Sequence, residues 1–282
     1  MRSPAAPPVA FVKMHGLGND FVIIDARAGA PDIGATAACA IADRHRGVGC
    51  DQVLILERPR AAEAAAFMRI RNADGSEAEA CGNGARCVAD FLMRAENRDA
   101  IALETAAGTL AASRAGEGRI AVDMGEPRWD WQAIPLAREC DTLHVPLSLG
   151  PLADPVCTNM GNPHATFFVS DAEAIDLARL GPALERDPIF PARANIGVAQ
   201  VLGLNRLRLR VWERGDGLTL ACGSGACAAL IAAARRGLAQ RSAELLLDGG
   251  TLAIEWRADN HVIMTGPVAV SFAGTLDPAL LG

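Results

Sequence analysis

The chain has 282 residues, of which 50% are hydrophobic and 21% charged, and its formal net charge is −6. This length and apolar content fit one large or two moderate folded domains and exclude wholesale disorder. The acidic balance, without a long basic run, argues against a nucleic-acid-binding protein, and the best apolar run, residues 226–234, is under half of the roughly 20 residues that a membrane helix needs.

The first half contains a recognisable succession of elements. Alternating hydrophobic residues predict a strand over 67–71, and the polar residues 72–75 predict a turn after it. A Cys-Gly-Asn-Gly loop follows at 81–84, and a helical run covers 85–94. Residues 114–119 separate two short strand-like runs and predict a hairpin turn.

The second half repeats this succession. A strand is predicted over 207–212, a polar turn over 214–217, a Cys-Gly-Ser-Gly loop at 222–225 and a helix over 226–236. Two further hairpin turns are predicted at 248–250 and at 259–260.

The halves are expected to meet near Gly125–Pro127, because residues 128–155 contain five prolines or glycines and are typical of a linker. We therefore predict an N-terminal domain over 1–127 and a C-terminal domain over 128–267. The last strand, near 268–272, is expected to return to the first unit, so that residues 268–282 join it.

Three pairs of segments indicate an ancient duplication. Residues 80–85 (ACGNGA) match 221–226 (ACGSGA), and 68–71 (MRIR) match 207–210 (LRLR). Residues 19–24 loosely match 162–169. The three separations are nearly equal and far longer than a solenoid repeat. Many short strands with few helices predict the α+β class.

The two Cys-Gly-x-Gly loops are the segments that can carry chemistry. A glycine-rich loop entering a helix exposes backbone N–H groups that favour a carboxylate, and the same groups can lower the pKa of a cysteine placed there. Two such thiols around one carboxylate-bearing substrate fit inversion of an α-carbon, in which a thiolate removes a proton and a thiol delivers one to the other face. Aligned N–H donors would stabilise the intermediate carbanion.

Other kinds of site find no support. The eight cysteines form no C-x-x-C pair, so a zinc ribbon is not expected. Lys13, the single lysine, is the one candidate for a Schiff base, and neither a phosphate-binding G-x-x-x-x-G-K-[ST] loop nor a complete G-x-G-x-x-G occurs. We therefore predict no metal and no cofactor. The N-terminus has no apolar core of signal-peptide length, which predicts a cytoplasmic protein with reduced thiols.

Cysteine is also a common small core residue, so a single Cys-Gly-x-Gly loop would favour a packing role. Two copies at duplicated positions reverse that preference for Cys81 and Cys222. Core packing is the expected role of the remaining cysteines, which are Cys39, Cys50, Cys87, Cys140, Cys157 and Cys227.

Eight ordered motifs resemble those of the diaminopimelate epimerases, cofactor-independent enzymes with two catalytic cysteines. They are residues 13–21 (KMHGLGNDF), 47–52 (GVGCDQ), 72–76 (NADGS), 81–87 (CGNGARC), 161–164 (GNPH), 195–197 (NIG), 212–215 (WERG) and 221–225 (ACGSG). The resemblance spans nearly the whole chain. It implies two pseudo-symmetric α/β domains, each a curved sheet wrapped around a central helix, with the active site in the cleft between them.

The resemblance also implies a reaction and its residues. The reaction is epimerisation of LL- to meso-2,6-diaminopimelate, a step of lysine and peptidoglycan-precursor biosynthesis, with Cys81 and Cys222 as the acid–base pair. The α-carboxylate would be held by Gly82, Asn83, Gly223 and Ser224. The other polar groups of this small-molecule amino-acid substrate would be held by Asn19, Gln52, Asn72, Asn162, Asn195, Glu213 and Arg214.

Each of these assignments has a structural alternative. The asparagines adjoin Gly, Pro or Asp, where asparagine is a usual turn residue. Arg214 can be an exposed charge with Glu213 as its surface partner. His164 either tunes a catalytic thiol together with Glu213 or packs and caps a turn.

Two positions depart from the family pattern. Cys50 stands where a bulky apolar residue is frequent, which would place an oxidisable thiol near the site. The chain has no tyrosine, and Phe272 occupies the place of a tyrosine that helps form the homodimer in many relatives. A homodimer is therefore expected in which the Phe272 ring can still pack at the interface but the hydrogen bond of a tyrosine hydroxyl is absent.

Two other functions remain open at this stage. One is a related racemase or epimerase acting on proline or hydroxyproline, although Glu213, Arg214 and the asparagines favour a substrate with a polar distal end. The other is a non-catalytic, thiol-sensing relative. The loss of one cysteine would have indicated that role, and both are present.

Overall fold

The structure is a computed structural model that describes residues 8–29, 32–116 and 118–281. Residues 1–7, in the stretch considered above for a signal peptide, and Glu117, in the predicted 114–119 turn, lie outside the described residues. The chain divides into two compact units. The first comprises the chain up to Val122 and again from Pro267, and the second comprises Asp123–Gly266.

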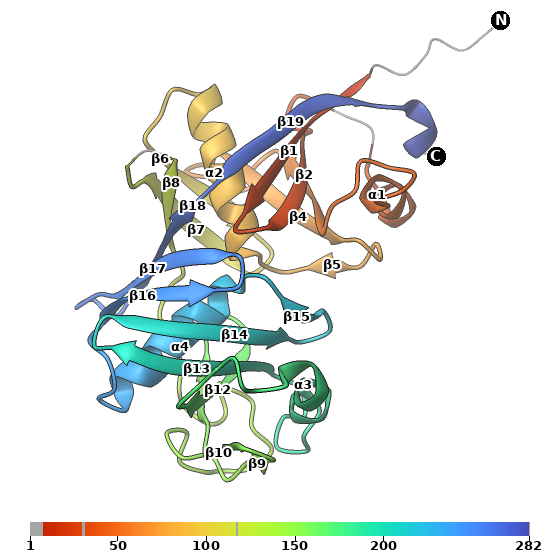
Figure 1. The fold of residues 1–282 in the computed structure, drawn as a ribbon. Coiled ribbons are helices and arrows are strands. Elements are labelled where there is room, and N and C mark those ends of the chain that lie inside the picture. The colour runs from red at the N-terminus through yellow and green to blue at the C-terminus, as the bar shows by residue number, and fades with distance from the viewer. Residues whose placement is uncertain (1–7, 30–31, 117, 282) are drawn as a thin grey trace, which may run out of the picture. The chain divides into compact units, whose positions relative to one another are not determined.

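The first unit is built mainly of strands (Figure 1). They are β1 (Val9–Gly16), β2 (Asn19–Asp25), β3 (Gln52–Glu57), β4 (Ala66–Asn72), β5 (Glu77–Ala78), β6 (Ala100–Thr105), β7 (Gly108–Arg114), β8 (Arg119–Asp123, which ends at the boundary) and β19 (Ala269–Leu276). Its helices are α1 (Ala35–Ala42), α2 (Gly82–Ala95) and the 3-10 turn η1 (Pro278–Leu280).

The second unit has the same make-up. Its strands are β9 (Ser148–Leu149), β10 (Leu152–Ala153), β11 (Val156–Asn159), β12 (Pro163–Val169), β13 (Asn195–Gly203), β14 (Arg206–Glu213), β15 (Gly217–Thr219), β16 (Ser242–Leu247), β17 (Gly250–Trp256) and β18 (Val262–Pro267). Its helices are α3 (Leu177–Glu185) and α4 (Gly223–Arg235).

The order of strand pairings is the same in the two units. In the first, β1–β2 is antiparallel, β2–β3 parallel, β3–β4 antiparallel, β4–β6 parallel, and β6–β7–β8 antiparallel. In the second, β11–β12, β12–β13, β13–β14, β14–β16 and β16–β17–β18 repeat this sequence of directions. The α+β class and the pseudo-symmetry expected from the sequence are confirmed.

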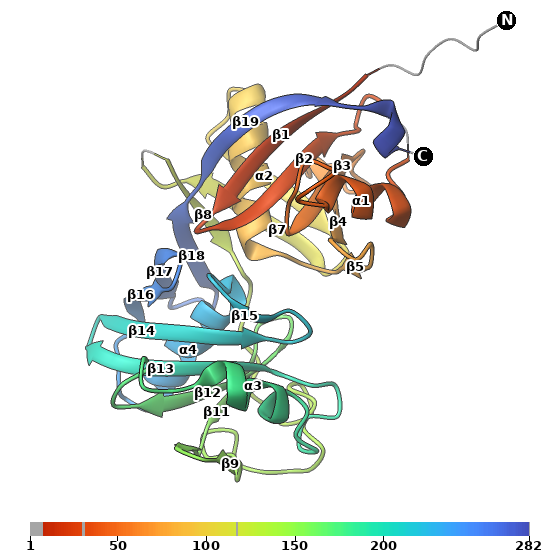
Figure 2. The same ribbon diagram turned by 45° about the vertical axis from the view of Figure 1, so that its right-hand side comes forward.

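Each central helix lies within the curve of its own sheet (Figure 2). Helix α2 contacts β1, β2, β6 and β7, and α4 contacts strands from β11 to β17. The residues of α4 from Ala226 to Ala233 are all small or apolar and fully buried, as is typical of a helix surrounded by strands. This arrangement places each helix N-terminus next to the ends of several strands.

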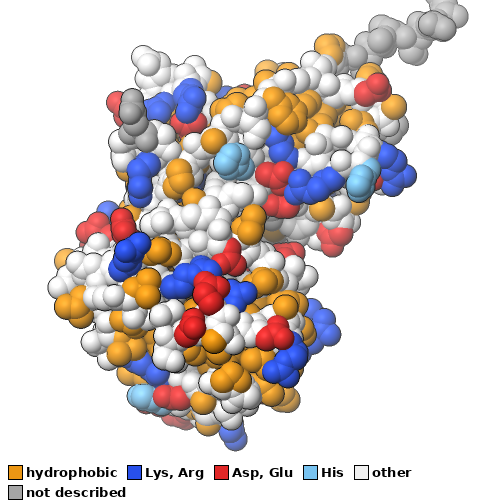
Figure 3. Space-filling view, viewed as in Figure 1, with side chains coloured by type: hydrophobic (Ala, Val, Ile, Leu, Met, Phe, Trp, Pro, Cys, Tyr) orange, Lys and Arg blue, Asp and Glu red, His pale blue; other side chains and the backbone are white. Residues whose placement is uncertain are grey.

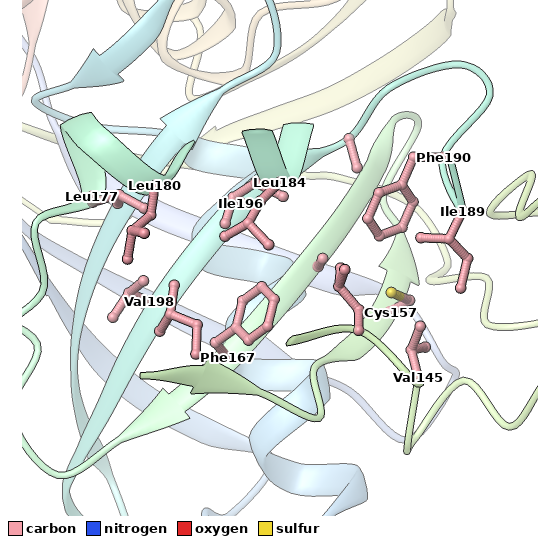
Figure 4. Packing of buried hydrophobic residues seen from close by; sticks show 14 of the residues in the cluster. Val145, Cys157, Phe167, Leu177, Leu180, Leu184, Ile189, Phe190, Ile196 and Val198 are labelled. Carbon is pink, nitrogen blue, oxygen red and sulfur yellow. The ribbon is translucent and has the colours of Figure 1, made fainter. Parts of the chain in front are cut away.

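Separate cores support the outer helices of the two units. In the second, Leu180 and Leu184 of α3 pack against Phe167 of β12 and Ile196 of β13 (Figure 4). In the first, a comparable cluster joins α1 to β2 and β3. Among the described residues no helix is long and apolar enough to cross a membrane.

The predicted strands at 67–71 and 207–212 and the three hairpin turns are confirmed. The predicted helix starts are wrong. The helices begin at Gly82 and Gly223, so the glycine loops form the first helical turns. The low helix propensity of glycine favoured a loop there, whereas in the structure the preceding cysteine caps each helix and the glycines are helical.

Candidate active site

Cys81 is the N-terminal cap of α2. Its backbone is extended, with φ at −147°, and its Sγ accepts a hydrogen bond from the backbone N–H of Gly84 at 3.3 Å. Glycine at position 84 permits this close approach, since a Cβ there would lie 3.1 Å from Leu54 Cδ1 and 3.3 Å from the Cys81 sulfur. The thiol therefore lies directly at the positive end of the helix.

Cys222 occupies the same position at the start of α4. Its Sγ accepts from the backbone N–H of Gly225 at 3.4 Å, and a Cβ at position 225 would approach this sulfur to 3.1 Å. The duplication has thus placed one thiol at the N-terminus of each central helix, where the positive end of the helix dipole favours an anion.

Burial decides the protonation of Cys222. The residue is only 3% exposed, and burial together with the negative charge of Glu213 holds the pKa of the Cys222 thiol well above its usual value. The Gly225 N–H and the Ser224 hydroxyl act in the opposite direction and are outweighed. The helix terminus therefore acts on the pKa of Cys222 in the expected direction, but burial and Glu213 outweigh it and favour the thiol.

His164 reaches Cys222 through a serine. Its Nε2 lies 2.8 Å from Asn162 Oδ1 and 3.0 Å from Ser224 Oγ, and Ser224 Oγ lies 3.7 Å from the Cys222 sulfur. Burial, assisted by the charge of Arg214, lowers the pKa of His164 to about 3. The imidazole is therefore neutral, and it positions Ser224 without forming an ion pair with the thiol.

Asn195 holds two segments of the second unit together. Its Nδ2 donates to the Pro163 carbonyl at 2.9 Å, and its Oδ1 accepts from the backbone N–H of Arg214 at 2.9 Å. The Arg214 guanidinium donates to the Ala192 carbonyl at 3.1 Å. Both asparagine groups thus engage the chain itself, which fixes the turn that carries Glu213 and Arg214.

Glu185, at the end of α3, is a supporting residue that sequence reasoning missed. It is 3% exposed and accepts from Trp212 Nε1 at 2.8 Å and from the Gly215 N–H at 3.3 Å. Its carboxylate therefore holds both sides of Glu213 and Arg214. No motif surrounds Glu185, and the one available signal was that it is the single acidic residue of α3.

In the first unit, Asn83 is connected to Asn19. Asn83 Nδ2 lies 3.3 Å from Asn19 Oδ1, and Asn19 Nδ2 donates to Asp51 Oδ2 at 2.8 Å. Asp51 is held in turn by Arg44 at 2.7 Å. The structure thus joins two residues that are 64 positions apart in the chain, beside the Cys81 cap.

Gln52 and Asn72 form a second polar pair in this unit. They are opposite one another on the antiparallel strands β3 and β4, and Gln52 Nε2 donates to Asn72 Oδ1 at 2.8 Å. Asn72 Nδ2 donates to Ser76 Oγ at 3.0 Å. Asn72 also forms the turn predicted at 72–75, since its carbonyl accepts from the Gly75 N–H at 2.9 Å.

The predicted residues therefore fall into one group in each unit. The first unit carries Asn19, Gln52, Asn72, Cys81, Gly82 and Asn83, and the second carries Asn162, His164, Asn195, Glu213, Arg214, Cys222, Gly223 and Ser224.

The remaining cysteines have the environments of packing residues or lie apart from these groups. Cys87, Cys157 and Cys227 are fully buried, as predicted. Cys50 is also buried, and burial raises its pKa to about 12. It is thus a poor target for oxidants, contrary to the concern raised by its position. Cys39 and Cys140 are partly exposed.

Known proteins resemble this chain over nearly its full length. The family model described as diaminopimelate epimerase matches residues 11–130 and 156–271. A diaminopimelate epimerase of Rhodospirillum centenum is 58% identical, covering 96% of this chain and 93% of its own. One of Acidiphilium cryptum is 56% identical, covering 96% and 97%.

Two solved structures share the fold at low identity. A hydroxyproline epimerase from Agrobacterium vitis, with bound trans-4-hydroxy-L-proline, has a TM-score of 0.70 at 16% identity, covering 99% of this chain and 96% of that one. A probable proline racemase from Agrobacterium radiobacter has a TM-score of 0.69, also at 16% identity, covering 97% and 96%. At this identity the likeness concerns the fold alone.

Proposed function

Because the chain belongs to the diaminopimelate epimerase family, we propose that it interconverts LL- and meso-2,6-diaminopimelate through a thiolate–thiol pair, Cys81 and Cys222. The observation that carries this proposal is the equivalence of the two thiols. Each caps the central helix of its unit, with its sulfur on the N–H of the third helical residue. An inversion needs two such groups, since proton removal and delivery occur on opposite faces.

The proposed step balances without another reactant. One thiolate takes the α-proton, which forms an S–H bond and leaves the C–H electron pair on the substrate. That pair spreads into the α-carboxylate, which the backbone N–H groups at Gly82, Asn83, Gly223 and Ser224 stabilise. The other thiol then gives its proton to the opposite face and becomes a thiolate. The reverse reaction uses the same groups with exchanged roles.

Cys222 is assigned the acid in the protonation state described here. Its raised pKa, to which the nearby Glu213 carboxylate contributes, keeps a proton on the sulfur until the substrate carbanion takes it. His164 and Ser224 keep the sulfur in place without adding charge.

The substrate has an amino-acid group at each end and needs both hydrogen-bond donors and acceptors. We assign its recognition to the backbone at the two helix starts and to Asn19, Gln52, Asn72, Asn83, Asn162, Asn195, Glu213 and Arg214. For Asn195 the second amide hydrogen is the group assigned, because its other groups hold Pro163 and Arg214.

The first test is proton exchange with solvent. Reduced protein is incubated with LL-diaminopimelate in deuterated water without added cofactor, and the product is examined by NMR and mass spectrometry. We expect meso product with deuterium at the inverted α-carbon. Folded, reduced protein that gives neither product nor exchange would overturn the proposal, and the same assay with proline and hydroxyproline would show whether either is the substrate.

Cys81→Ala and Cys222→Ala test the pair. Each should lower turnover at least about 100-fold, the lower range for loss of an acid–base group. Cys140→Ala is the matched control, because Cys140 is a partly exposed thiol outside both groups. Wild-type turnover by either Cys81→Ala or Cys222→Ala would contradict the two-base assignment.

The enzyme is further proposed to work in the cytoplasm as a homodimer. The mechanism needs free thiols, which a reducing compartment maintains. Dimerisation is supported by β19, where Val270 is 47% and Phe272 50% exposed. Every residue of β19 from Ala269 to Thr275 is exposed, whereas a strand normally buries at least alternate residues.

A further inference from the structure

A chain of hydrogen bonds in the first unit starts at a carboxylate and ends at Gln52. Asp74 Oδ1 accepts from the Ser76 hydroxyl at 2.5 Å and from the Ser76 N–H at 2.9 Å. The hydroxyl hydrogen is thereby committed to Asp74, so Ser76 Oγ can only accept from Asn72. An ionised carboxylate accepts and never donates, which gives the chain a fixed direction.

This donor-to-acceptor direction fixes the orientation of two carboxamides in turn. Asn72 places its Nδ2 on Ser76 Oγ at 3.0 Å, which turns its oxygen toward Gln52. Gln52 Nε2 donates a hydrogen bond to Asn72 Oδ1 at 2.8 Å. The Gln52 oxygen, Oε1, is therefore the end of the chain. Without a fixed first member, each amide could turn over and exchange its donor and acceptor.

The end of this chain lacks a partner in the part of the molecule that the structure describes. Gln52 Oε1 is buried and accepts no hydrogen bond there. A buried acceptor without a donor is costly, and a functional role is one explanation for its retention. The matching ligand group is a donor, and a carboxylate offers none at neutral pH.

We propose that Asp74 and Ser76 are positioning residues, which orient the Gln52 carboxamide so that its oxygen accepts a hydrogen bond from an ammonium group of the substrate. This assignment rests on the proposed function, since it takes diaminopimelate as the substrate. With this orientation, the Gln52 oxygen favours binding of a substrate ammonium group and disfavours a substrate carboxylate at the same position. A low pKa of Asp74, caused by its bonds from Ser76, is consistent with an ionised start of the chain.

The kinetic test compares Ser76→Ala, Ser76→Thr and Asp74→Asn. Ser76→Ala removes the hydroxyl, and Asp74→Asn lets an amide donate to Ser76. In both variants the carboxamides of Asn72 and Gln52 are then free to turn over and exchange donor and acceptor. We expect KM for LL-diaminopimelate to rise about tenfold in each, the size of one hydrogen bond to a charged group, with kcat within about twofold. Ser76→Thr keeps the hydroxyl and should retain the wild-type KM.

Asp43→Asn is the matched control. Asp43 also accepts a backbone N–H two residues ahead, from His45 at 2.8 Å, but its side chain pairs with Arg46 at 2.9 Å and has no bond to Gln52, Asn72 or Ser76. Equal KM changes in Ser76→Ala and Ser76→Thr would overturn the proposal, as would a tenfold change in Asp43→Asn or a loss confined to kcat. If Asp74→Asn does not fold, the two Ser76 variants decide.

The chemistry of the ligand group is tested by a crystal structure of Cys81→Ala with LL-diaminopimelate. An ammonium nitrogen within hydrogen-bond distance of the Gln52 carboxamide supports the assignment, and a carboxylate there overturns it. The proposed function fails separately, when wild-type protein does not turn over LL-diaminopimelate. If the wild type turns over LL-diaminopimelate but the variants do not show the expected KM changes, only the role of Asp74 and Ser76 is refuted.

Discussion

The state of Cys222 results from opposing influences on one sulfur atom. The helix N-terminus and Ser224 favour the thiolate, whereas burial and Glu213 favour the thiol and prevail. A helix terminus by itself is therefore an insufficient guide to thiol reactivity, because desolvation of the charged form can exceed its effect.

Removing the Glu213 charge should lower the pKa of the Cys222 thiol toward its usual value. In Glu213→Gln the repulsion between carboxylate and thiolate is lost, so the pKa of Cys222 should fall and its thiolate fraction at a given alkaline pH should rise. Alkylation of Cys222 by iodoacetamide, followed by mass spectrometry across pH, should show the midpoint moved to lower pH. Glu173→Gln, in the same unit and paired with Arg208, should leave the midpoint unchanged. An upward shift in Glu213→Gln would contradict this account.

His164 provides a second residue-scale prediction, for stability against pH. Its pKa is about 3 in the folded chain and 6.5 for the free side chain, so between these values the unfolded state binds the extra proton. Stability must therefore fall as the pH drops below about 6.5. His164→Gln removes this contribution.

The measurement is urea unfolding at pH 7 and pH 5. The wild type should lose more free energy of unfolding than His164→Gln when the pH is lowered. His45→Gln, which removes an exposed histidine, should behave as the wild type does. Identical losses in wild type and His164→Gln would show that His164 is not held neutral.

At the scale of elements, the end of α3 is connected to the end of β14 by Glu185. Its loss would leave Trp212 Nε1 and the Gly215 N–H without their acceptor, which costs about 1–3 kcal/mol for a buried group. Glu185→Ala should lower the free energy of unfolding by about this amount and lower kcat/KM, since the turn bearing Glu213 and Arg214 loosens. Glu185→Gln, which keeps an acceptor, should retain part of both.

A double-mutant cycle with Trp212→Phe isolates the tryptophan bond. If Glu185 acts through Trp212, the two substitutions should not be additive in the free energy of unfolding. Strict additivity would mean that the Glu185–Trp212 contact contributes nothing and that the effect of Glu185 lies elsewhere.

The same scale shows what the sequence alone could predict. The strands at 67–71 and 207–212 follow from alternation, and both cysteine loops follow from the repeat. The helix starts do not, because glycine at positions 82 and 223 has low helix propensity and the cap that compensates for it is a weak thiol acceptor. Although each cap joins residues only three positions apart, cysteine is not among the residues whose presence usually marks a helix start.

The candidate site divides in the same way. Asn19, Gln52 and Asn72 are predicted from motifs that resemble those of the family. Glu185 is not, since it lies 27 positions from Trp212 and its role depends on how α3 packs on β14. The direction of the bonds from Asp74 to Gln52 is also invisible in the sequence, because spacing does not say which carboxamide atom faces which partner.

At the scale of the whole molecule, the chain leaves the first unit at Val122 and re-enters it at Pro267. The returning strand β19 pairs antiparallel with β1, with Phe272 opposite Lys13, and thus adds a strand that the other unit lacks. The two units therefore differ at β19, and this strand carries the exposed Val270 and Phe272.

This surface is apolar around β1 and β19 (Figure 3). Phe272 packs edge-on against Phe11, with ring centroids 5.9 Å apart, and Phe11 also lines a groove of about 440 Å³ with Val9 and Ala273. Exposed apolar side chains next to a groove are typical of an interface, and a two-fold dimer would place each ring against the same surface of its partner.

Phe272→Ser should therefore convert a dimer into a monomer at micromolar concentration, because it removes the largest apolar group of this surface. Sedimentation velocity gives the measurement, with Leu204→Ser as control: Leu204 is 62% exposed in the other unit, and its removal should leave the dimer intact. A wild-type monomer, or equal dissociation in both variants, would refute the role of β19. If Phe272→Ser is monomeric and also loses activity while circular dichroism shows it folded, then association through β19 supports catalysis, although Phe272 is assigned no contact with the substrate.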